Sequence, residues 1–317
     1  MKRTAILAAV LVTVGLFAAC GGTAQGAGSA ATAGAAVAQS VENGGEQAAE
    51  KAQAGEQAVF DGVTSGDTAG ASAETQADEE AYDYRGKTVS FSGDSITTFS
   101  GYIPDGYVPT YPEDDLQEVA QAWWMQVIDR MGMEYLANAS FSGGTVSGKS
   151  LDSTGRYGSS FRRADDLAGP EGEAPDVIFI LNGTNDFIQS KPLGTYEAGK
   201  TIAEGEVGNF ADAYALMVTK LRAQYPQARI ICMTCIPVTR WSDENRQDYS
   251  EGVNELGLTI RDYNEVIRQV AEGFGCLVVD TYESFTDAEA NRYTYDGVHP
   301  NAAGAEKMAA YIVRHLQ

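Results

Sequence analysis

Short apolar runs alternate with amphipathic helical patterns along residues 84–317, and this alternation constrains the fold more than any other feature. The runs predicted as strands are Thr88–Ser92, Tyr135–Ala139, Val177–Leu181, Arg229–Ile236 and Cys276–Val279. The patterns predicted as helices are Leu116–Met131, Asn209–Gln224, Leu256–Glu272 and Ala302–Leu316. Strands that alternate with helices typically build a parallel sheet covered on both faces. The sequence therefore predicts one α/β domain, a three-layer sandwich around about five parallel strands.

The first 20 residues have the features of an export signal. Lys2 and Arg3 precede an apolar run, Ala5–Phe17, that is too short to span a bilayer. Small residues then lead up to Cys20, and the segment resembles the lipobox of bacterial lipoprotein precursors. The resemblance implies cleavage before Cys20, a lipid on its thiol and a membrane-anchored protein of the cell envelope. Plain secretion stays open as the alternative, because Phe17 stands where leucine is more usual.

Residues 21–83 consist mainly of Ala, Gly, Gln, Ser, Thr and Glu, with scarcely a large apolar side chain besides Phe60. Such a segment cannot bury enough apolar surface to offset the entropy lost on ordering. Its charges are nearly all negative, which keeps it solvated and extended. We therefore predict a disordered tether between the anchor and the domain.

The charge of the whole chain excludes one class of partner. The sequence has 22 basic and 44 acidic residues, a formal charge of −22. This charge repels the phosphate backbone, so nucleic-acid binding is excluded as a main role.

Reactive groups in open parallel sheets lie at the carboxyl ends of the strands. The first predicted strand runs into the sequence GDS at 93–95, a turn that exposes the hydroxyl of Ser95. A serine is inert at neutral pH without an adjacent base, so this triplet alone is weak evidence.

The base is suggested by the scarcity of histidine, since the chain has only His299 and His315. His299 directly precedes the last predicted helix, and Asp296 lies three residues before it. That carboxylate can orient one ring nitrogen while the other faces Ser95, which predicts a Ser95–His299–Asp296 triad. For an isolated DxxH pattern, a helix cap and a surface histidine would be the better interpretation. His315 lies in the last helical turn, where a structural role is expected.

Two polar loops follow the second and third predicted strands. They read NASFSGG at 138–144 and NGTND at 182–186. An acyl-transfer site needs donors aimed at the developing oxyanion. The backbone amides of Ser95 and Gly143 and the side-chain amide of Asn185 can supply three.

The sequences GDSI, NASFSGG, GTND and DGVH occur in this order and resemble the Ser, Gly, Asn and His blocks of the SGNH (GDSL-type) hydrolases. The resemblance extends from Lys87 to the C-terminus. It implies a flavodoxin-like fold with Ser95, Gly143, Asn185 and His299 as signature residues. Ser140 departs from the pattern, since many relatives have glycine there, but that position is not a donor.

Aromatic residues near the predicted site are weaker signals. Tyr102 and Tyr107 lie in a Pro-rich loop after Ser95, which would form either a sugar-stacking wall or a packed cover over the sheet edge. Trp241 follows the fourth strand and is a further candidate for substrate contact. Trp123 and Trp124 lie in a helical pattern and are expected in the core.

The cysteines and the acidic residues do not suggest a cofactor. Cys232 and Cys235 fall within one predicted strand, and their odd separation would point them to opposite faces. Buried free thiols are therefore expected, although a disulfide with Cys276 stays open. The sequence contains no phosphate-binding loop, EF-hand pattern or His/Cys cluster, so we predict no cofactor and no metal.

These observations predict an extracellular serine esterase that acts through an acyl-serine intermediate. Removal of O-acetyl groups from carbohydrate is the leading expectation, based on the tether and the aromatic loop. A lysophospholipase or thioesterase acting on lipid substrates is one alternative. A catalytically silent glycan-binding lipoprotein is another, because fold does not determine function. Transfer of the acyl group to a sugar instead of water would use the same residues.

Overall fold

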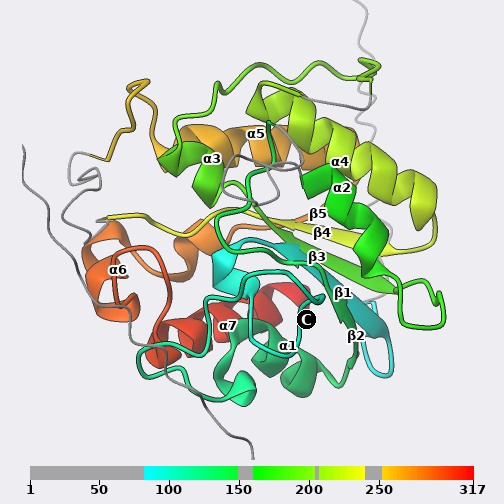
Figure 1. Ribbon diagram of the computed structural model, residues 1–317, viewed down its shortest axis with the longest axis vertical. Coiled ribbons are helices and arrows are strands. Elements are labelled where there is room, and N and C mark those ends of the chain that lie inside the picture. The colour runs from blue at the N-terminus through cyan, green and yellow to red at the C-terminus, as the bar shows by residue number, and fades with distance from the viewer. Residues whose placement is uncertain (1–81, 149–159, 204–206, 240–251) are drawn as a thin grey trace, which may run out of the picture. The chain divides into compact units, whose positions relative to one another are not determined.

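The computed structural model describes residues 82–148, 160–203, 207–239 and 252–317, which form a three-layer α/β/α sandwich (Figure 1). Its strands are β1 (Thr88–Gly93), β2 (Glu134–Asn138), β3 (Val177–Leu181), β4 (Arg229–Met233) and β5 (Leu277–Val279). All neighbouring strands are parallel, in the order β2-β1-β3-β4-β5. The predicted fold class is confirmed. The predicted signal peptide, Cys20, nearly all of the tether and Trp241 lie outside the described residues.

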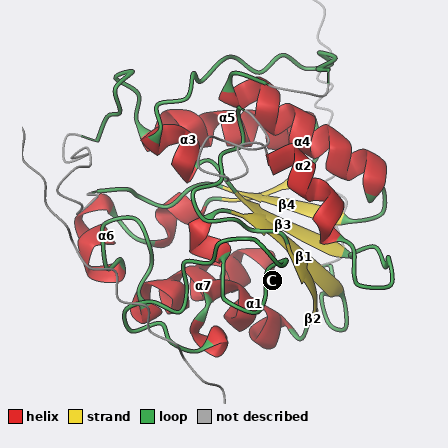
Figure 2. Ribbon diagram, viewed as in Figure 1, coloured by secondary structure: helices red, strands yellow, loops and turns green. Residues whose placement is uncertain are grey.

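Helices cover both faces of the sheet (Figure 2). The seven described α-helices are α1 (Trp123–Met131), α2 (Ser160–Arg163), α3 (Thr184–Ile188), α4 (Phe210–Gln224), α5 (Ile260–Gly273), α6 (Asp287–Tyr293) and α7 (Ala302–Leu316). Helices α1 and α7 pack together on one face, and α4 and α5 pack together on the other. None of the helices in the described ranges is both long enough and apolar enough to cross a bilayer.

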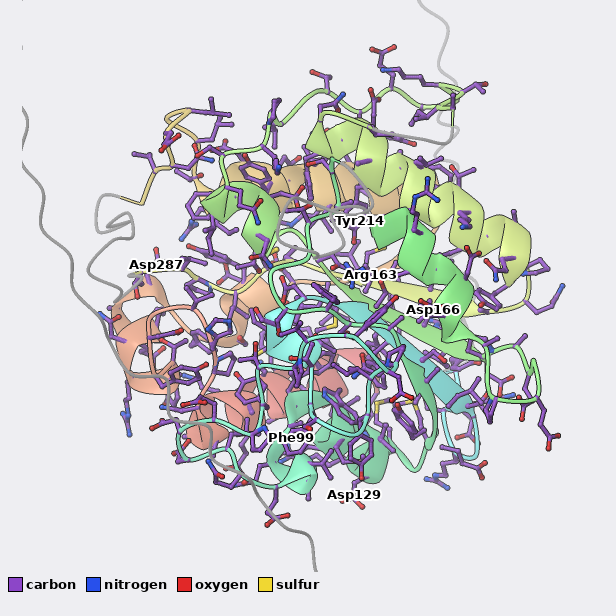
Figure 3. The ribbon with its side chains drawn as sticks, viewed as in Figure 1. Phe99, Asp129, Arg163, Asp166, Tyr214 and Asp287 are labelled. Atoms are coloured by element: carbon purple, nitrogen blue, oxygen red, sulfur yellow. The ribbon has the colours of Figure 1, made fainter. Side chains whose placement is uncertain are left out.

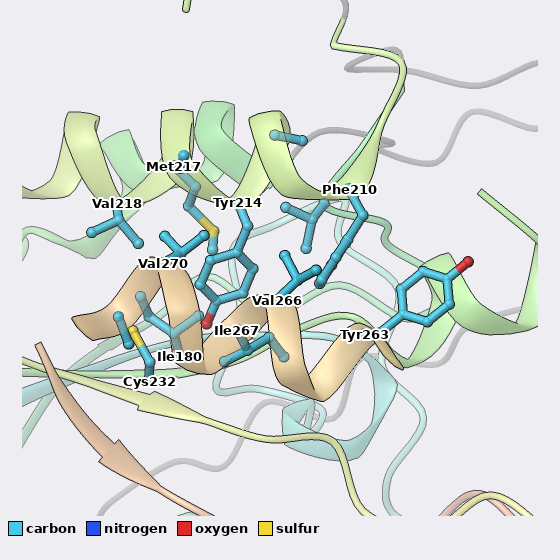
Figure 4. Packing of buried hydrophobic residues seen from close by; sticks show 14 of the residues in the cluster. Ile180, Phe210, Tyr214, Met217, Val218, Cys232, Tyr263, Val266, Ile267 and Val270 are labelled. Atoms are coloured by element: carbon cyan, nitrogen blue, oxygen red, sulfur yellow. The ribbon is translucent and has the colours of Figure 1, made fainter. Parts of the chain in front are cut away.

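Side chains of the central strands alternate between two hydrophobic clusters, as the two-residue period of a strand requires. Val177, Phe179 and Leu181 of β3 face α1 and α7, whereas Ile178 and Ile180 face α4 and α5. Figure 4 shows the cluster on the side of α4 and α5, in which Tyr214 extends from α4 toward Cys232, alongside Val266 and Val270 of α5. Strands buried on both faces explain why the sequence shows continuous apolar runs here.

Two predicted elements have the bounds of the structure, β3 and α7, and α4 begins one residue after its predicted start. Asn209 caps α4, because its side chain accepts a hydrogen bond from the Asp212 amide at 2.9 Å. The helix predicted at 116–131 is wrong in its first half: a 3₁₀ helix at 119–121 is separated from α1 by extended backbone at Ala122. The helix predicted from Leu256 begins instead at Ile260.

The fourth strand ends earlier than predicted, which corrects the argument about the cysteines. β4 stops at Met233, so Cys235 lies beyond it and the alternation of faces no longer applies. Cys232 and Cys235 pack in the same hydrophobic cluster, on the side of α4 and α5. Both are fully buried free thiols, and Cys276 is a partly buried free thiol. Free thiols were the default expectation from the sequence.

Phe179 offers a direct test of the core. Its ring is 1% exposed and stacks on Phe91 with 5.5 Å between ring centroids. Phe179→Ala should lower the free energy of unfolding by about 3–5 kcal/mol, because it removes buried surface and leaves a cavity. Urea denaturation measures this, with Leu256→Ala as the control, since Leu256 is 52% exposed. Equal, small losses in both variants would contradict the described core.

Candidate active site

Ser95 lies immediately past the carboxyl end of β1, at the start of a 3₁₀ helix over 95–97. The carboxylate of Asp94 caps this turn by accepting a hydrogen bond from the Ile96 amide at 3.1 Å. Glycine is required at 93, because a Cβ there would lie 2.5 Å from Thr97 Oγ1. The turn leaves 7% of Ser95 exposed.

The structure brings His299 and Asp296 to Ser95, as the sequence predicts. His299 Nε2 lies 2.8 Å from Ser95 Oγ, and His299 Nδ1 lies 2.6 Å from Asp296 Oδ2. Asp296 Oδ1 also accepts hydrogen bonds from the backbone amides of Val298 and His299, at 2.9 and 2.8 Å. The carboxylate thus fixes both the loop and the imidazole that the loop carries.

The charge of Asp296 determines which histidine nitrogen carries the proton. Burial alone would raise the pKa of Asp296, but the hydrogen bonds and the charge of His299 outweigh burial and lower it. An ionised carboxylate only accepts hydrogen bonds, so Nδ1 is the donor in this contact. In the neutral imidazole, Nε2 is then free to accept from the Ser95 hydroxyl.

The three predicted oxyanion donors come from the ends of neighbouring strands. Ser95 follows β1, Gly143 follows β2 with a φ of 75°, and Asn185 follows β3 in the first turn of α3. Asn185 is 7% exposed. Its Nδ2 is buried and has no hydrogen-bond partner among the described residues. An unpaired buried donor is costly, and an anionic oxygen would relieve that cost.

The loop over 98–112 connects Ser95 to the Gly143 loop. Thr98 Oγ1 donates to the Ser95 carbonyl at 2.9 Å and accepts from the Thr110 amide at 2.8 Å. The Thr110 and Ser142 hydroxyls are 2.7 Å apart, and the Ser142 amide donates to the Val108 carbonyl at 3.1 Å. The hydroxyl groups of Thr98, Thr110 and Ser142 therefore link three backbone segments: the turn at Ser95, the chain around Thr110 and the loop that carries Gly143.

The same loop also contacts the histidine loop. Tyr111 is buried, and its hydroxyl donates to the carbonyl of Pro300 at 2.7 Å. The ring of Tyr295 stacks on His299, with 5.6 Å between centroids and 17° between planes. Together with the contacts to Asp296, these interactions restrict the imidazole to one orientation.

Sequence reasoning missed Asp186, which binds the segment that follows Gly143. Its carboxylate accepts hydrogen bonds from the Val146 amide at 2.8 Å and the Ser147 amide at 2.9 Å, and from the Ser147 hydroxyl at 2.6 Å. Burial raises the pKa of Asp186 to about 6, against the opposing effect of these hydrogen bonds. Its position directly after Asn185 in GTND was the available signal.

The structure separates the aromatic candidates. Tyr102 packs among Phe99, Trp124 and Tyr135, which favours the packing interpretation for this residue. Tyr107 packs edge-on against Phe141, two residues before Gly143, and its hydroxyl donates to Asp166 at 2.5 Å.

The remaining predictions concern the core tryptophans, His315 and metal ions. Trp123 and Trp124 are buried in the core, as predicted. His315 is exposed and stacks on Tyr311. In the part of the chain that the structure describes, no group of three or more His, Cys, Asp or Glu residues is placed to hold a metal ion.

Comparison with known proteins identifies the family. The sequence model for GDSL-like Lipase/Acylhydrolase matches residues 87–261. A multidomain esterase of Ruminococcus flavefaciens is 25% identical over 147 residues, which are 45% of this chain and 16% of that protein. This chain thus spans less than a fifth of that relative.

Solved structures share the fold. A candidate GDSL-like lipase from Bacteroides ovatus is 24% identical and matches 73% of this chain and 98% of its own, with a TM-score of 0.54. Another from Bacteroides uniformis is 22% identical and matches 73% of this chain and 95% of its own, also with a TM-score of 0.54. At these identities the likeness establishes the fold.

The buried carboxyl of Asp186 predicts a pH-dependent stability. Its pKa of about 6 in the folded protein lies above the ordinary value of about 4 for an aspartate side chain. As the pH falls, the Asp186 carboxyl is therefore protonated at a higher pH in the folded state than in the unfolded state. Its contribution to the free energy of unfolding is complete below about pH 4 and is lost as the pH rises through 6. Relative to Asp186→Asn, the wild type should gain on the order of 3 kcal/mol between pH 7 and pH 4.

Urea denaturation of the wild type and Asp186→Asn across this range measures the difference. Asp105→Asn, which removes an exposed carboxylate, serves as the control. A constant difference between wild type and Asp186→Asn at every pH would show that Asp186 does not titrate in this range.

Proposed function

The chain belongs to the GDSL-like lipase/acylhydrolase family, and on this premise we propose that it hydrolyses carboxylic esters through an acyl-enzyme formed on Ser95. The contact that carries the proposal is the 2.8 Å approach of His299 Nε2 to Ser95 Oγ. A serine becomes a nucleophile only with such an adjacent base. The name of the Ruminococcus flavefaciens relative, a multidomain esterase, supports the same class of reaction.

In the first half-reaction, His299 Nε2 takes the hydroxyl proton of Ser95 while Oγ attacks the ester carbonyl carbon. The carbonyl oxygen becomes an oxyanion that accepts hydrogen bonds from the Ser95 and Gly143 amides and from Asn185 Nδ2. Asp296 stabilises the imidazolium through its 2.6 Å contact with Nδ1. The C–O bond to the alcohol then breaks, and the leaving oxygen takes the proton from His299.

The second half-reaction repeats these steps with water. His299 removes a proton from water as its oxygen attacks the acyl carbon, and the same donors hold the second oxyanion. Collapse of this intermediate breaks the bond to Ser95 Oγ, which recovers its proton from His299. The carboxylic acid leaves and the enzyme is regenerated.

The surroundings of Gly143 support a short acyl group on a polar alcohol. Hydroxyl groups of Thr98, Thr110 and Ser142 gather beside the oxyanion loop, where a long acyl chain would need apolar contacts. Only 7% of Ser95 is exposed, which favours a narrow acyl group. We therefore favour an O-acetyl ester of a carbohydrate as the substrate, with Tyr107 beside the Gly143 loop as a contact for the sugar.

Export and lipidation complete the proposal. Lys2, Arg3, the apolar run Ala5–Phe17 and the small residues before Cys20 support cleavage before Cys20 and a lipid on its thiol. A lipid-anchored domain on a polar tether would reach polysaccharides outside the cell. This location agrees with an acetylated glycan as the substrate.

The first test is hydrolysis of nitrophenyl esters of increasing acyl length by the purified protein. Acetate should be the fastest substrate, and Ser95→Ala should lower kcat at least about 10³-fold, since the residual rate would depend on the oxyanion donors alone. Ser284→Ala, which removes a buried serine hydroxyl away from His299, is the control and should keep wild-type kcat. Thermal denaturation confirms that both variants fold.

Each alternative gives a different result. A preference for long acyl chains would support a lysophospholipase or thioesterase. If the wild type hydrolyses every ester only as slowly as Ser95→Ala does, the result would support a catalytically silent glycan-binding protein. Acetylated sugar products formed at the expense of free acetate would indicate acyl transfer to sugar.

Lipidation is tested separately by expression in bacteria fed an alkyne-labelled fatty acid. The full-length protein should incorporate the label and sediment with membranes, whereas Cys20→Ala should do neither. Cys276→Ala removes another thiol and should remain labelled. Label in Cys20→Ala, or none in the wild type, would refute lipidation at this residue.

A further inference from the structure

We propose that Arg163 is a positioning residue that fixes the three strand ends from which the oxyanion donors project, and the proposal rests on the esterase activity above. Arg163 closes α2 and extends toward the sheet (Figure 3). It does not belong to any of the sequence blocks that carry the family resemblance. Its side chain is among the largest fully buried ones in the described chain, at 1% exposure.

One guanidinium contacts the ends of three strands. Arg163 Nη1 donates to the Gly93 carbonyl at 2.6 Å, at the end of β1, and to the Ala139 carbonyl at 2.9 Å, just past β2. Arg163 Nη2 donates to Asn182 Oδ1 at 3.3 Å, just past β3. The planar fork of arginine can hold acceptors in several directions at once, which a lysine ammonium on a flexible stem does not reproduce.

Each of these acceptors shortly precedes an oxyanion donor in the chain. Gly93 is two residues before Ser95, Ala139 is four before Gly143, and Asn182 is three before Asn185. A shift of any one strand end would move its donor relative to the other two. Oxyanion donors act only within a narrow range of distances, so the relative position of the three strand ends determines their effect.

The guanidinium also lies against the backbone next to Gly143. A Cβ added at Gly144 would lie 3.1 Å from Arg163 Nη2 and 2.9 Å from the Phe141 carbonyl. A larger residue at 144 would displace the Phe141 carbonyl and crowd the guanidinium. Arg163, next to Gly144, and Asp186, bonded to Val146 and Ser147, therefore both hold the segment that carries Gly143.

Burying the guanidinium of Arg163 costs desolvation free energy, which indicates a specific role for this side chain. Desolvation lowers the pKa of Arg163, while the nearby charges of Asp94 and Asp186 oppose that shift. An apolar side chain of similar volume would fill the same space without the desolvation cost. It could not, however, hold three strand ends through hydrogen bonds.

A purely structural arginine would have the same contacts, so the test must separate folding from catalysis. The full-length variants are Arg163→Met, Arg163→Lys and the control Arg162→Met, which alters the exposed neighbour on α2. Active-site titration with a fluorophosphonate counts competent sites. We would then measure kcat and KM for nitrophenyl acetate per titrated site, and inhibition by a trifluoromethyl ketone that forms a tetrahedral adduct with serine.

For Arg163→Met we expect kcat per titrated site to fall about 100-fold with KM changed by less than about threefold, because the donors act on the transition state. Binding of the ketone should weaken by the same factor as kcat/KM. Arg163→Lys should recover part of the loss, and Arg162→Met should match the wild type. A folded Arg163→Met with wild-type kcat per titrated site would overturn the proposal.

If Arg163→Met does not fold, Arg163→Lys decides the question, because it keeps the positive charge and the length of the side chain but lacks the planar fork that contacts three strand ends. The proposal expects a lower kcat per titrated site and weaker ketone binding in folded Arg163→Lys, and wild-type values there would overturn it. A wild-type protein that neither turns over esters nor reacts with the fluorophosphonate would instead refute the esterase function itself.

Discussion

The contact between Ser95 Oγ and His299 Nε2 joins residues 204 positions apart, and much of the domain serves to keep these two atoms at 2.8 Å. Ser95 is fixed through β1, whose last residue pairs with Leu181 in the centre of the sheet. His299 is fixed through α7, which Asn301 caps by accepting from the Gly304 amide at 2.9 Å. Because α7 packs on α1 and against the sheet, the hydrophobic core sets the distance between Ser95 and His299.

Buried charges gather at the carboxyl edge of the sheet, where the core is least apolar. Asp94, Arg163 and Asp186 are all fully buried, and each is hydrogen-bonded to backbone groups of the loops around the oxyanion donors. Burial raises the pKa of both carboxyls and lowers that of the guanidinium, so each charged form destabilises the folded state. The hydrogen bonds of these buried charges hold the surrounding loops in one defined backbone conformation. Apolar contacts would specify that conformation less strictly.

Sequence reasoning was most accurate where one period governs a whole element. β3 and α7 have the predicted bounds because polar residues border both patterns, Asp176 and Asn182 for β3 and Asn301 and Gln317 for α7. The helix predicted from Leu116 starts before the helix of the structure. Its apolar spacing continues through a 3₁₀ turn, and a 3.6-residue period does not distinguish such a turn from an α-helix. The contacts among Ser95, His299 and Asp296 could be predicted because these residues lie in short sequence blocks. Arg163 was missed because its partners are carbonyl groups up to 70 residues away, which no local pattern reveals.

The loop over 98–112 contacts both the Gly143 loop and the His299 loop. Two consecutive residues make these contacts: Thr110 contacts Ser142 next to Gly143, and Tyr111 contacts Pro300 next to His299. The same loop exposes Val108 to solvent, with 46% of that side chain accessible. A substitution in this loop would therefore disturb both the Gly143 loop and the His299 loop. Under the proposed function, substrate preference and rate should change together in such variants, because this one segment contacts the loops of the proposed oxyanion donor and the proposed base.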